Sequence, residues 1–192
     1  MPPDKFGWRF HWYKDTKGAS CYTRSMTNQA EYKRTTVVFP VQEDRILLGM
    51  KKRGFGEGWW NGFGGKLDSG ETYVASAIRE TAEEVELELA QNALRHAADI
   101  VFRFDGTVDV VTKAYIATSF SGTPVETEEM KPQWFPLDRI PYSDMWPGDD
   151  QWIPKILGKK ALLPLGFIID FTKNNEFIGI ESVDSQSLEG YF

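Results

Sequence analysis

The sequence predicts an α/β protein built on a mixed β-sheet. Three observations lead to this prediction: β-branched or alternating segments typical of strands, two segments with helical character among them, and a glycine-rich stretch directly before the first helix. The 192 residues fit one domain with an appended arm. We therefore expect an aromatic-rich N-terminal arm over residues 1–33 and a larger folded domain over residues 34–192.

Strands are expected where apolar residues alternate or run together between turn residues. These segments are residues 35–41, 45–52, 99–105, 112–120, 133–141, 166–171 and 177–183. A polar turn joins the first two segments, and the third and fourth alternate well enough to be antiparallel strands. The last two are expected to form a terminal hairpin around Thr172–Asn175.

Helical character is found in two segments. In the first, over about residues 71–84, one apolar stripe is expected to face the core, namely Val74, Ala77, Ile78, Thr81 and Val85. The second covers residues 148–160; we expect Asp149 or Asp150 to start it, with Pro154 inside its first turn. Residues 54–66 hold six glycines and are expected to form a loop with close backbone approaches.

Composition and charge exclude several classes of function. With 28 acidic and 22 basic residues the formal charge is −6, which argues against binding a nucleic-acid polymer. No apolar run approaches the length of a membrane span. Cys21 is the only cysteine, so no intrachain disulfide can form and a reducing compartment fits. We expect a cytoplasmic monomer, with a mitochondrial or nuclear fraction as the alternative.

An acidic cluster marks the first predicted helix. Glu80 lies three residues before Glu83 and four before Glu84, and like charges at these spacings destabilise an isolated helix by about 0.2–0.5 kcal/mol per pair. A solvated acidic face is one interpretation. The other is a divalent cation, because Mg²⁺ prefers oxygen ligands and usually brings substrate phosphates. The preceding "GFGGK" favours the second, since its backbone and lysine can approach phosphate.

The spacing of these residues resembles the signature of the Nudix family. The matching positions are Gly65, Glu71, Arg79, Glu80, Glu83, Glu84 and Leu87. Two positions depart from it: Thr81 replaces a large apolar residue, and Glu86 replaces a glycine that ends the helix. We expect Thr81 to fit a partly buried face, and Glu86 to require a helix exit without the usual left-handed cap.

The resemblance implies an α/β/α sandwich and a hydrolase. Water would attack a nucleoside diphosphate linkage with the help of Mg²⁺, for which Mn²⁺ is a possible substitute. The implied catalytic metal ligands are Glu80, Glu83 and Glu84, joined by the Gly64 carbonyl, with Glu80 or Glu84 as an alternative general base. Arg79 and Glu71 are implied to form an ion pair that orients loop and helix.

From about Thr35 to Lys160, the sequence is similar to the branch of this family that hydrolyses oxidised purine nucleoside triphosphates. The resemblance includes "LLGMKKRGFGEGWWNGFGGK" and "GTPVETEEMKPQWFPLDRIPYSDMWP". It implies conversion of 8-oxo-dGTP and 2-hydroxy-dATP to monophosphate and pyrophosphate, which sanitises the nucleotide pool and avoids DNA damage. It also implies an additional metal ligand, Glu129. The implied substrate contacts are Thr36, Lys51, Phe55, Asn61, Phe63, Lys66, Phe102, Trp146 and Asp149, with Phe104 as a contact or a core residue.

One departure leaves the preferred base open. That branch has two consecutive aspartates after Trp-Pro, and here Gly148 takes the place of the first and Asp149 that of the second. Two alternatives therefore stand beside oxidised purines. One is a Nudix hydrolase for another modified nucleotide, such as a methylated purine triphosphate or a nucleotide sugar. The other is a non-catalytic nucleotide-binding module, which would require a broken acidic cluster.

Overall fold

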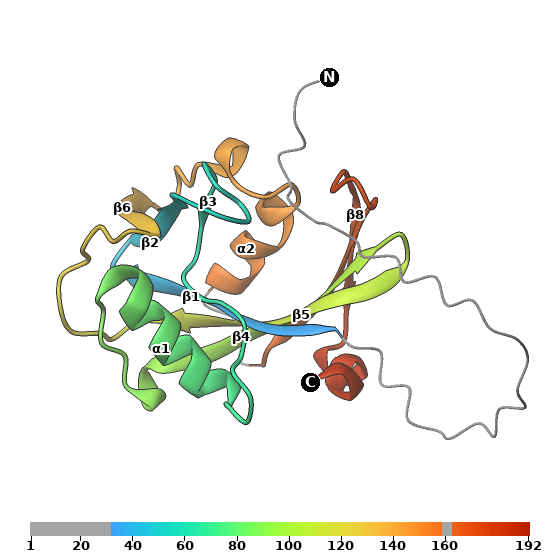
Figure 1. Cartoon of the computed structure of the whole chain (residues 1–192), viewed down its shortest axis with the longest axis horizontal. Helices are drawn as coiled ribbons and strands as arrows, with labels where there is room; N and C mark the ends of the chain where they lie inside the picture. The colour runs from blue at the N-terminus through green and yellow to red at the C-terminus, as the bar shows by residue number, and fades with distance from the viewer. Residues whose placement is uncertain (1–31, 159–162) are drawn as a thin grey trace, which may run out of the picture. The chain divides into compact units, whose positions relative to one another are not determined.

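A mixed β-sheet organises the described part of the chain. The computed structural model describes residues 32–158 and 163–192, so the predicted arm lies outside the described residues except for Tyr32 and Lys33. Within these ranges the sheet has eight strands, in the order β3-β2-β1-β5-β4-β7-β8, with β6 also paired to β2 (Figure 1). The strands are β1 (Lys33–Gln42), β2 (Arg45–Lys51), β3 (Trp60–Asn61), β4 (Leu94–Phe104), β5 (Thr107–Ala117), β6 (Met130–Pro136), β7 (Leu165–Phe171) and β8 (Phe177–Val183).

Strand β1 connects the two halves of the sheet. Over Lys33–Pro40 it pairs in parallel with β5, and at its end Val41 and Gln42 turn to antiparallel partners on β2. The β4–β7 pair is also parallel, whereas β4–β5, β7–β8, β2–β3 and β2–β6 are antiparallel. The predicted mixed sheet is thus confirmed, including the β4–β5 pair and the terminal hairpin β7–β8.

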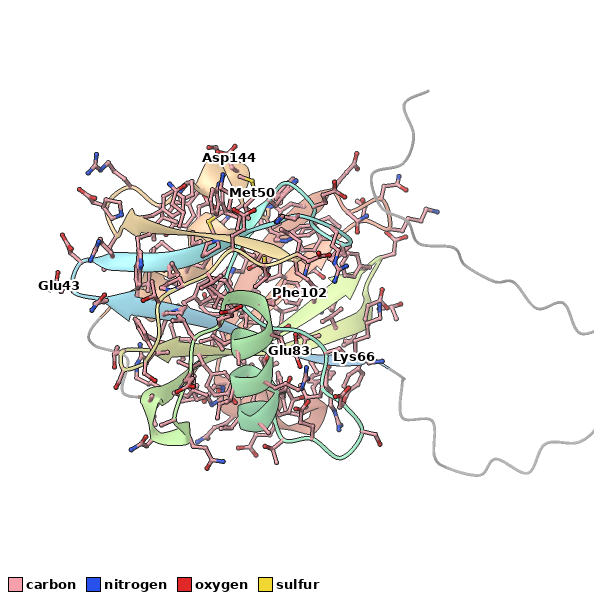
Figure 2. All side chains as sticks on the ribbon, turned by 60° about the vertical axis from the view of Figure 1, so that its left-hand side comes forward. Glu43, Met50, Lys66, Glu83, Phe102 and Asp144 are labelled. Carbon is pink, nitrogen blue, oxygen red and sulfur yellow. The ribbon has the colours of Figure 1, made fainter. Side chains whose placement is uncertain are left out.

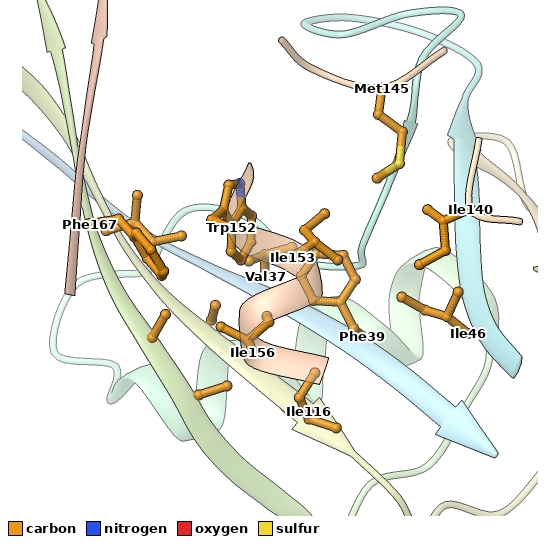
Figure 3. Close-up of a cluster of buried hydrophobic side chains, with 14 of the residues drawn as sticks. Val37, Phe39, Ile46, Ile116, Ile140, Met145, Trp152, Ile153, Ile156 and Phe167 are labelled. Carbon is orange, nitrogen blue, oxygen red and sulfur yellow. The ribbon is translucent and has the colours of Figure 1, made fainter. Parts of the chain in front are cut away.

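The two α-helices lie on opposite faces of β1, as alternation of side chains along a strand requires. Val38 packs with Ala77 of α1 (Tyr73–Val85), whereas its neighbours Val37 and Phe39 belong to the cluster that contains Trp152 of α2 (Asp149–Leu157). Figure 3 shows this second cluster, in which α2 lies over β1. The arrangement is the predicted helix–sheet–helix sandwich. Short 3₁₀ turns follow at η1 (Gln91–Ala93), η2 (Tyr142–Asp144) and η3 (Ser185–Tyr191).

One prediction about α2 is confirmed and one is wrong. The helix starts at Asp149, as predicted, and its N-cap is Gly148, in the left-handed region at φ 97°. The Asp149 carboxylate accepts a hydrogen bond from Trp152. Pro154 therefore lies beyond the first turn, where it has no N–H to donate to the helix. The ring of Pro154 is exposed to solvent. The buried face of α2 is therefore formed by Trp152 and its neighbours.

The end of α1 also differs from prediction. Glu86 does take the left-handed cap position, at φ 59° and ψ 27°, and its backbone N–H donates to Ala82 O at 3.0 Å. The next residue, Leu87, is fully buried, so the chain must turn inward at once. Burial of Leu87 overrides the preference of position 86 for glycine, at a cost of about 1–2 kcal/mol for an L-residue. In the described ranges, no helix is long and apolar enough to cross a membrane.

Candidate active site

The acidic helix is joined to the glycine-rich loop by Arg79. Its guanidinium donates to both carboxylate oxygens of Glu71 at 2.9 Å, to Glu80 at 2.8 Å and to Glu83 at 3.2 Å. A weaker bond reaches the carbonyl of Lys66 at 3.4 Å. The hydrogen bond from Arg79 lowers the pKa of Glu71 to about 2. The ion pair implied by the family resemblance is therefore present, and it fixes the loop against α1.

Glu84 is the most buried of the helix acids, with 2% of its surface exposed. One carboxylate oxygen accepts from the backbone N–H of Gly64 at 2.9 Å, and the other accepts from the Lys51 ammonium at 3.2 Å. Burial raises the pKa of Glu84 to about 7, although the nearby Lys51 charge opposes this shift. Glu84 therefore joins the loop, α1 and the end of β2 at one point.

Glu80 lies directly against the backbone of the loop. A Cβ atom added at Gly65 would approach the Glu80 carboxylate to 2.5 Å, so a larger residue here would require the acid to move. Partial burial raises the pKa of Glu80, and Arg79 opposes that rise. At Gly64, a Cβ would lie 2.2 Å from Thr36 O. The loop is thus pressed onto both β1 and α1, and the two glycines make this possible.

Glu83 and Glu129 border this site on its exposed side. Glu83, labelled on α1 in Figure 2, leaves 60% of its side chain exposed. Glu129 precedes β6; its carboxylate accepts from Arg53 at 2.5 Å and lies 3.8 Å from the Lys51 ammonium. Arg53 was not predicted from the sequence, because no motif assigns it a role. The site therefore holds acids from both α1 and the β6 side.

The acids are near one another but are held apart by cations. Within residues 32–158 and 163–192, no three Asp, Glu, His or Cys side chains converge in a way that could hold a metal ion. Arg79 draws Glu80 and Glu83 to one side, and Lys51 holds Glu84. The donor set nevertheless fits a hard cation, because it consists of carboxylate oxygens beside a loop carbonyl.

Aromatic side chains gather where the glycine-rich loop meets the Trp-Pro turn. Trp146 stacks on Phe55 with ring centroids 4.8 Å apart and contacts Trp59 at 5.1 Å. A Cβ at Gly56 would lie 3.2 Å from the Trp146 ring, which explains a glycine between the two loop aromatics. Phe55 and Trp146 were predicted from the sequence, but Trp59 was not. Its position two residues before Asn61, itself a predicted contact, could have indicated it.

The polar residues chosen for base recognition have partners within the protein. The Asn61 side-chain oxygen accepts from the N–H of Gly62 at 2.8 Å. Asp149 is 7% exposed and accepts from Trp152 Nε1 at 2.9 Å, and burial raises the pKa of its carboxyl to about 7. Gly148 is confined by Phe177, because a Cβ at this position would lie 2.7 Å from the ring.

Other predicted contacts lie apart from the aromatic cluster. Phe63 is fully buried with Leu47 and Val85, so its ring is part of the core and not of the aromatic cluster. Thr36 is on the face of β1 that Val38 presents to α1, and its buried hydroxyl has no hydrogen-bond partner.

The remaining two aromatic candidates pack against the core. Phe102 is partly buried on the large cluster, and Phe104 stacks on Phe171 at 5.4 Å. Lys66, labelled in Figure 2, is exposed at the surface, and its backbone carbonyl accepts from Arg79 at 3.4 Å.

A model of the Nudix domain matches residues 31–156. The chain belongs to the Nudix family. It is 48% identical over 126 residues to the oxidized purine nucleoside triphosphate hydrolase of Mus musculus, covering 65% of this chain and 80% of that protein. The protein of the same name from Danio rerio is 46% identical over 129 residues, covering 67% of this chain and 81% of that protein.

Among solved structures, the mutator MutT protein of Bacillus halodurans has a TM-score of 0.66 at 24% identity, covering 78% of this chain and 97% of that chain. That likeness supports the Nudix fold.

Proposed function

We propose that this Nudix protein hydrolyses oxidised purine nucleoside triphosphates to monophosphate and pyrophosphate. Two observations support the proposal. The curated relatives from mouse and zebrafish that carry this name are 48% and 46% identical to the chain. The chain also retains every acid of the signature helix, with Glu84 buried between a loop N–H and Lys51. The second observation carries the chemistry, because a binding module would not need a buried, paired carboxylate beside a glycine-rich loop.

The metal of this proposal is Mg²⁺, with Mn²⁺ as a substitute, held by Glu80, Glu83, Glu84, Glu129 and the Gly64 carbonyl. When bound, such an ion lowers the pKa of a coordinated water and neutralises charge on the phosphates. Glu84 is suited to hold or accept a proton, since burial already raises its pKa to about 7. Arg79 orients the helix acids toward the loop. Lys51 and Lys66 supply positive charge for phosphate oxygens.

The purine would lie at the cluster of Phe55, Trp59 and Trp146. Stacking a base on an aromatic ring contributes about 1–3 kcal/mol in single-strand binders. Asn61 and Asp149 are the polar groups proposed to read the base, and each can accept or donate according to its amide or protonation state. Because Gly148 offers no side chain, a single carboxylate would face the base. We therefore propose that the site accepts more than one oxidised purine. The proposed partner is a small-molecule nucleotide, and the protein is proposed to be a monomer in the cytoplasm.

Product analysis by HPLC tests this function. Purified protein with Mg²⁺ should convert 8-oxo-dGTP and 2-hydroxy-dATP to monophosphate and pyrophosphate much faster than it converts dGTP. Equal, slow turnover of all three nucleotides would contradict the sanitising role.

Gly148 favours a second candidate function, in which the same site accepts a methylated purine triphosphate or another modified nucleotide. Faster turnover of an O⁶-methylated than an oxidised purine triphosphate in the same assay would select this alternative.

A further inference from the structure

The Lys51 ammonium lies between two acids that belong to different parts of the fold. Its Nζ atom is 3.2 Å from Glu84 on α1 and 3.8 Å from Glu129, which precedes β6. The side chain of Glu84 is 3% exposed, so little water is available to screen its charge. The ammonium therefore compensates like charges at the point where the proposed metal site needs a cation.

The backbone of Lys51 is fixed on both sides, which leaves only its side chain to move. Its N–H donates to Trp59 O at 3.0 Å, and its carbonyl accepts from Gly58 N at 2.8 Å. In the β2–β6 ladder it is aligned with Met130. The side chain, in contrast, is 23% exposed, so its ammonium has a way out to solvent.

We propose that Lys51 is a resident counter-ion of the metal site, which a divalent cation displaces and nucleotide phosphate then receives. The inference rests on the proposed function, because it takes Glu84 and Glu129 to be metal ligands. The physical reason is that an ammonium and a metal ion repel each other and compete for the negative charge of the same carboxylates. Lys51 thus acts on the acids before the metal arrives and on the phosphates afterwards.

This exchange couples metal binding to nucleotide binding. Without nucleotide, the metal must break the contacts of Lys51 with Glu84 and Glu129, so its affinity is lowered. With a triphosphate present, the displaced ammonium gains phosphate oxygens as new partners. Each ligand therefore raises the affinity for the other, and thermodynamic linkage makes the effect equal in both directions.

Direct measurement of Mn²⁺ binding by electron paramagnetic resonance tests the proposal. The samples are the wild type, Lys51→Gln and the matched control Lys52→Gln, each with and without the non-hydrolysable analogue α,β-methylene-dGTP. Lys52 is the adjacent lysine, and it contacts Glu126 at 2.8 Å and Thr127 O at 2.6 Å, neither of which is a proposed ligand.

Lys51→Gln should bind Mn²⁺ alone about fivefold more tightly than the wild type, as expected for loss of one partly buried ion pair. The gain in Mn²⁺ affinity caused by the analogue should shrink by a similar factor, whereas Lys52→Gln should behave like the wild type.

The outcomes separate this inference from the proposed function. If the wild type binds Mn²⁺ and hydrolyses nucleotide but Lys51→Gln binds Mn²⁺ equally or more weakly, the counter-ion role is overturned and the hydrolase stands. If the wild type binds no Mn²⁺ under any condition, both are overturned. An equal increase in Mn²⁺ affinity for Lys51→Gln and Lys52→Gln would indicate a general charge effect and also overturns the specific role.

Lysine NMR provides a test that does not depend on folding of Lys51→Gln. In wild-type protein with ¹³C-labelled lysine, the Lys51 Cε signal can be identified by its absence from the spectrum of Lys51→Arg. Addition of Mg²⁺ should shift this signal while that of Lys52 stays in place. A Lys51 signal that is unchanged at saturating Mg²⁺ overturns the displacement.

Discussion

At the scale of single residues, Glu84 shows how burial and charge are combined. Its carboxylate is nearly inaccessible to water, yet two donors, the Gly64 N–H and the Lys51 ammonium, hold it in place. Glutamine at this position would still accept a hydrogen bond from one of the two donors but would carry no negative charge. A single substitution can therefore separate the contribution of Glu84 to catalysis from its contribution to stability.

We expect Glu84→Gln to lower kcat by about 10²- to 10⁴-fold, the range associated with loss of a positioned acid–base group, while the protein remains folded. HPLC kinetics and thermal unfolding measure the two effects. Glu88→Gln is the control, because this exposed acid lies outside the site. A Glu84→Gln variant with wild-type kcat would contradict the assigned role.

Glu86 offers a second prediction at this scale. Since it occupies the left-handed C-cap of α1, Glu86→Gly should raise the free energy of unfolding by about 0.5–1 kcal/mol, which is the relief of strain minus the added entropy of the unfolded chain. Urea denaturation measures the change. Glu88→Gly should instead destabilise, because residue 88 is in an extended bridge to Ser121. An equal change in the free energy of unfolding for Glu86→Gly and Glu88→Gly would contradict backbone strain at Glu86.

At the scale of elements, the start of α2 is determined by its contact with β8. Gly148 has φ 97°, and Phe177 leaves no space for a Cβ there. From the sequence alone we expected a helix near this point and noted the glycine in place of an aspartate. The reason for the glycine is its contact with Phe177, which lies about thirty residues away in the chain, so no local sequence pattern reveals it.

We expect Gly148→Ala to destabilise the protein by about 2 kcal/mol or more, from left-handed strain and overpacking together. Phe177→Leu should recover part of this loss in the double variant, because only the overpacking depends on the ring. Chemical denaturation of the four proteins in this cycle gives the coupling energy. Simple additivity of the two single changes would contradict a contact between positions 148 and 177.

At the scale of the whole molecule, the buried carboxyl of Asp149 makes stability depend on pH. Its pKa in the fold is raised to about 7, above the ordinary value of about 3.9 in the unfolded chain. The unfolded state therefore releases this proton first, and the contribution of Asp149 to stability falls as the pH rises from about 4 to 7.

Asp149→Asn removes this dependence and keeps an acceptor for Trp152. We expect the variant to gain about 1–3 kcal/mol of stability relative to the wild type at pH 8, with a smaller gain at pH 5. Thermal unfolding across this pH range measures the difference, in which contributions from other groups cancel. A gain that is constant or that decreases with rising pH would mean that Asp149 is ionised in the fold.

The sequence by itself determined the class of fold, the acidic helix and the glycine-rich loop, because each depends on residues that are close together in the chain. The Arg79–Glu71 pair was implied by the family resemblance. Only the tertiary structure decided that Phe63 is core, that Glu86 forms a left-handed cap and that Thr36 is on the α1 face of β1. The same holds for the partners of Lys51 and Gly148. Those outcomes depend on which distant segments meet, and burial and packing between segments outweigh local preference.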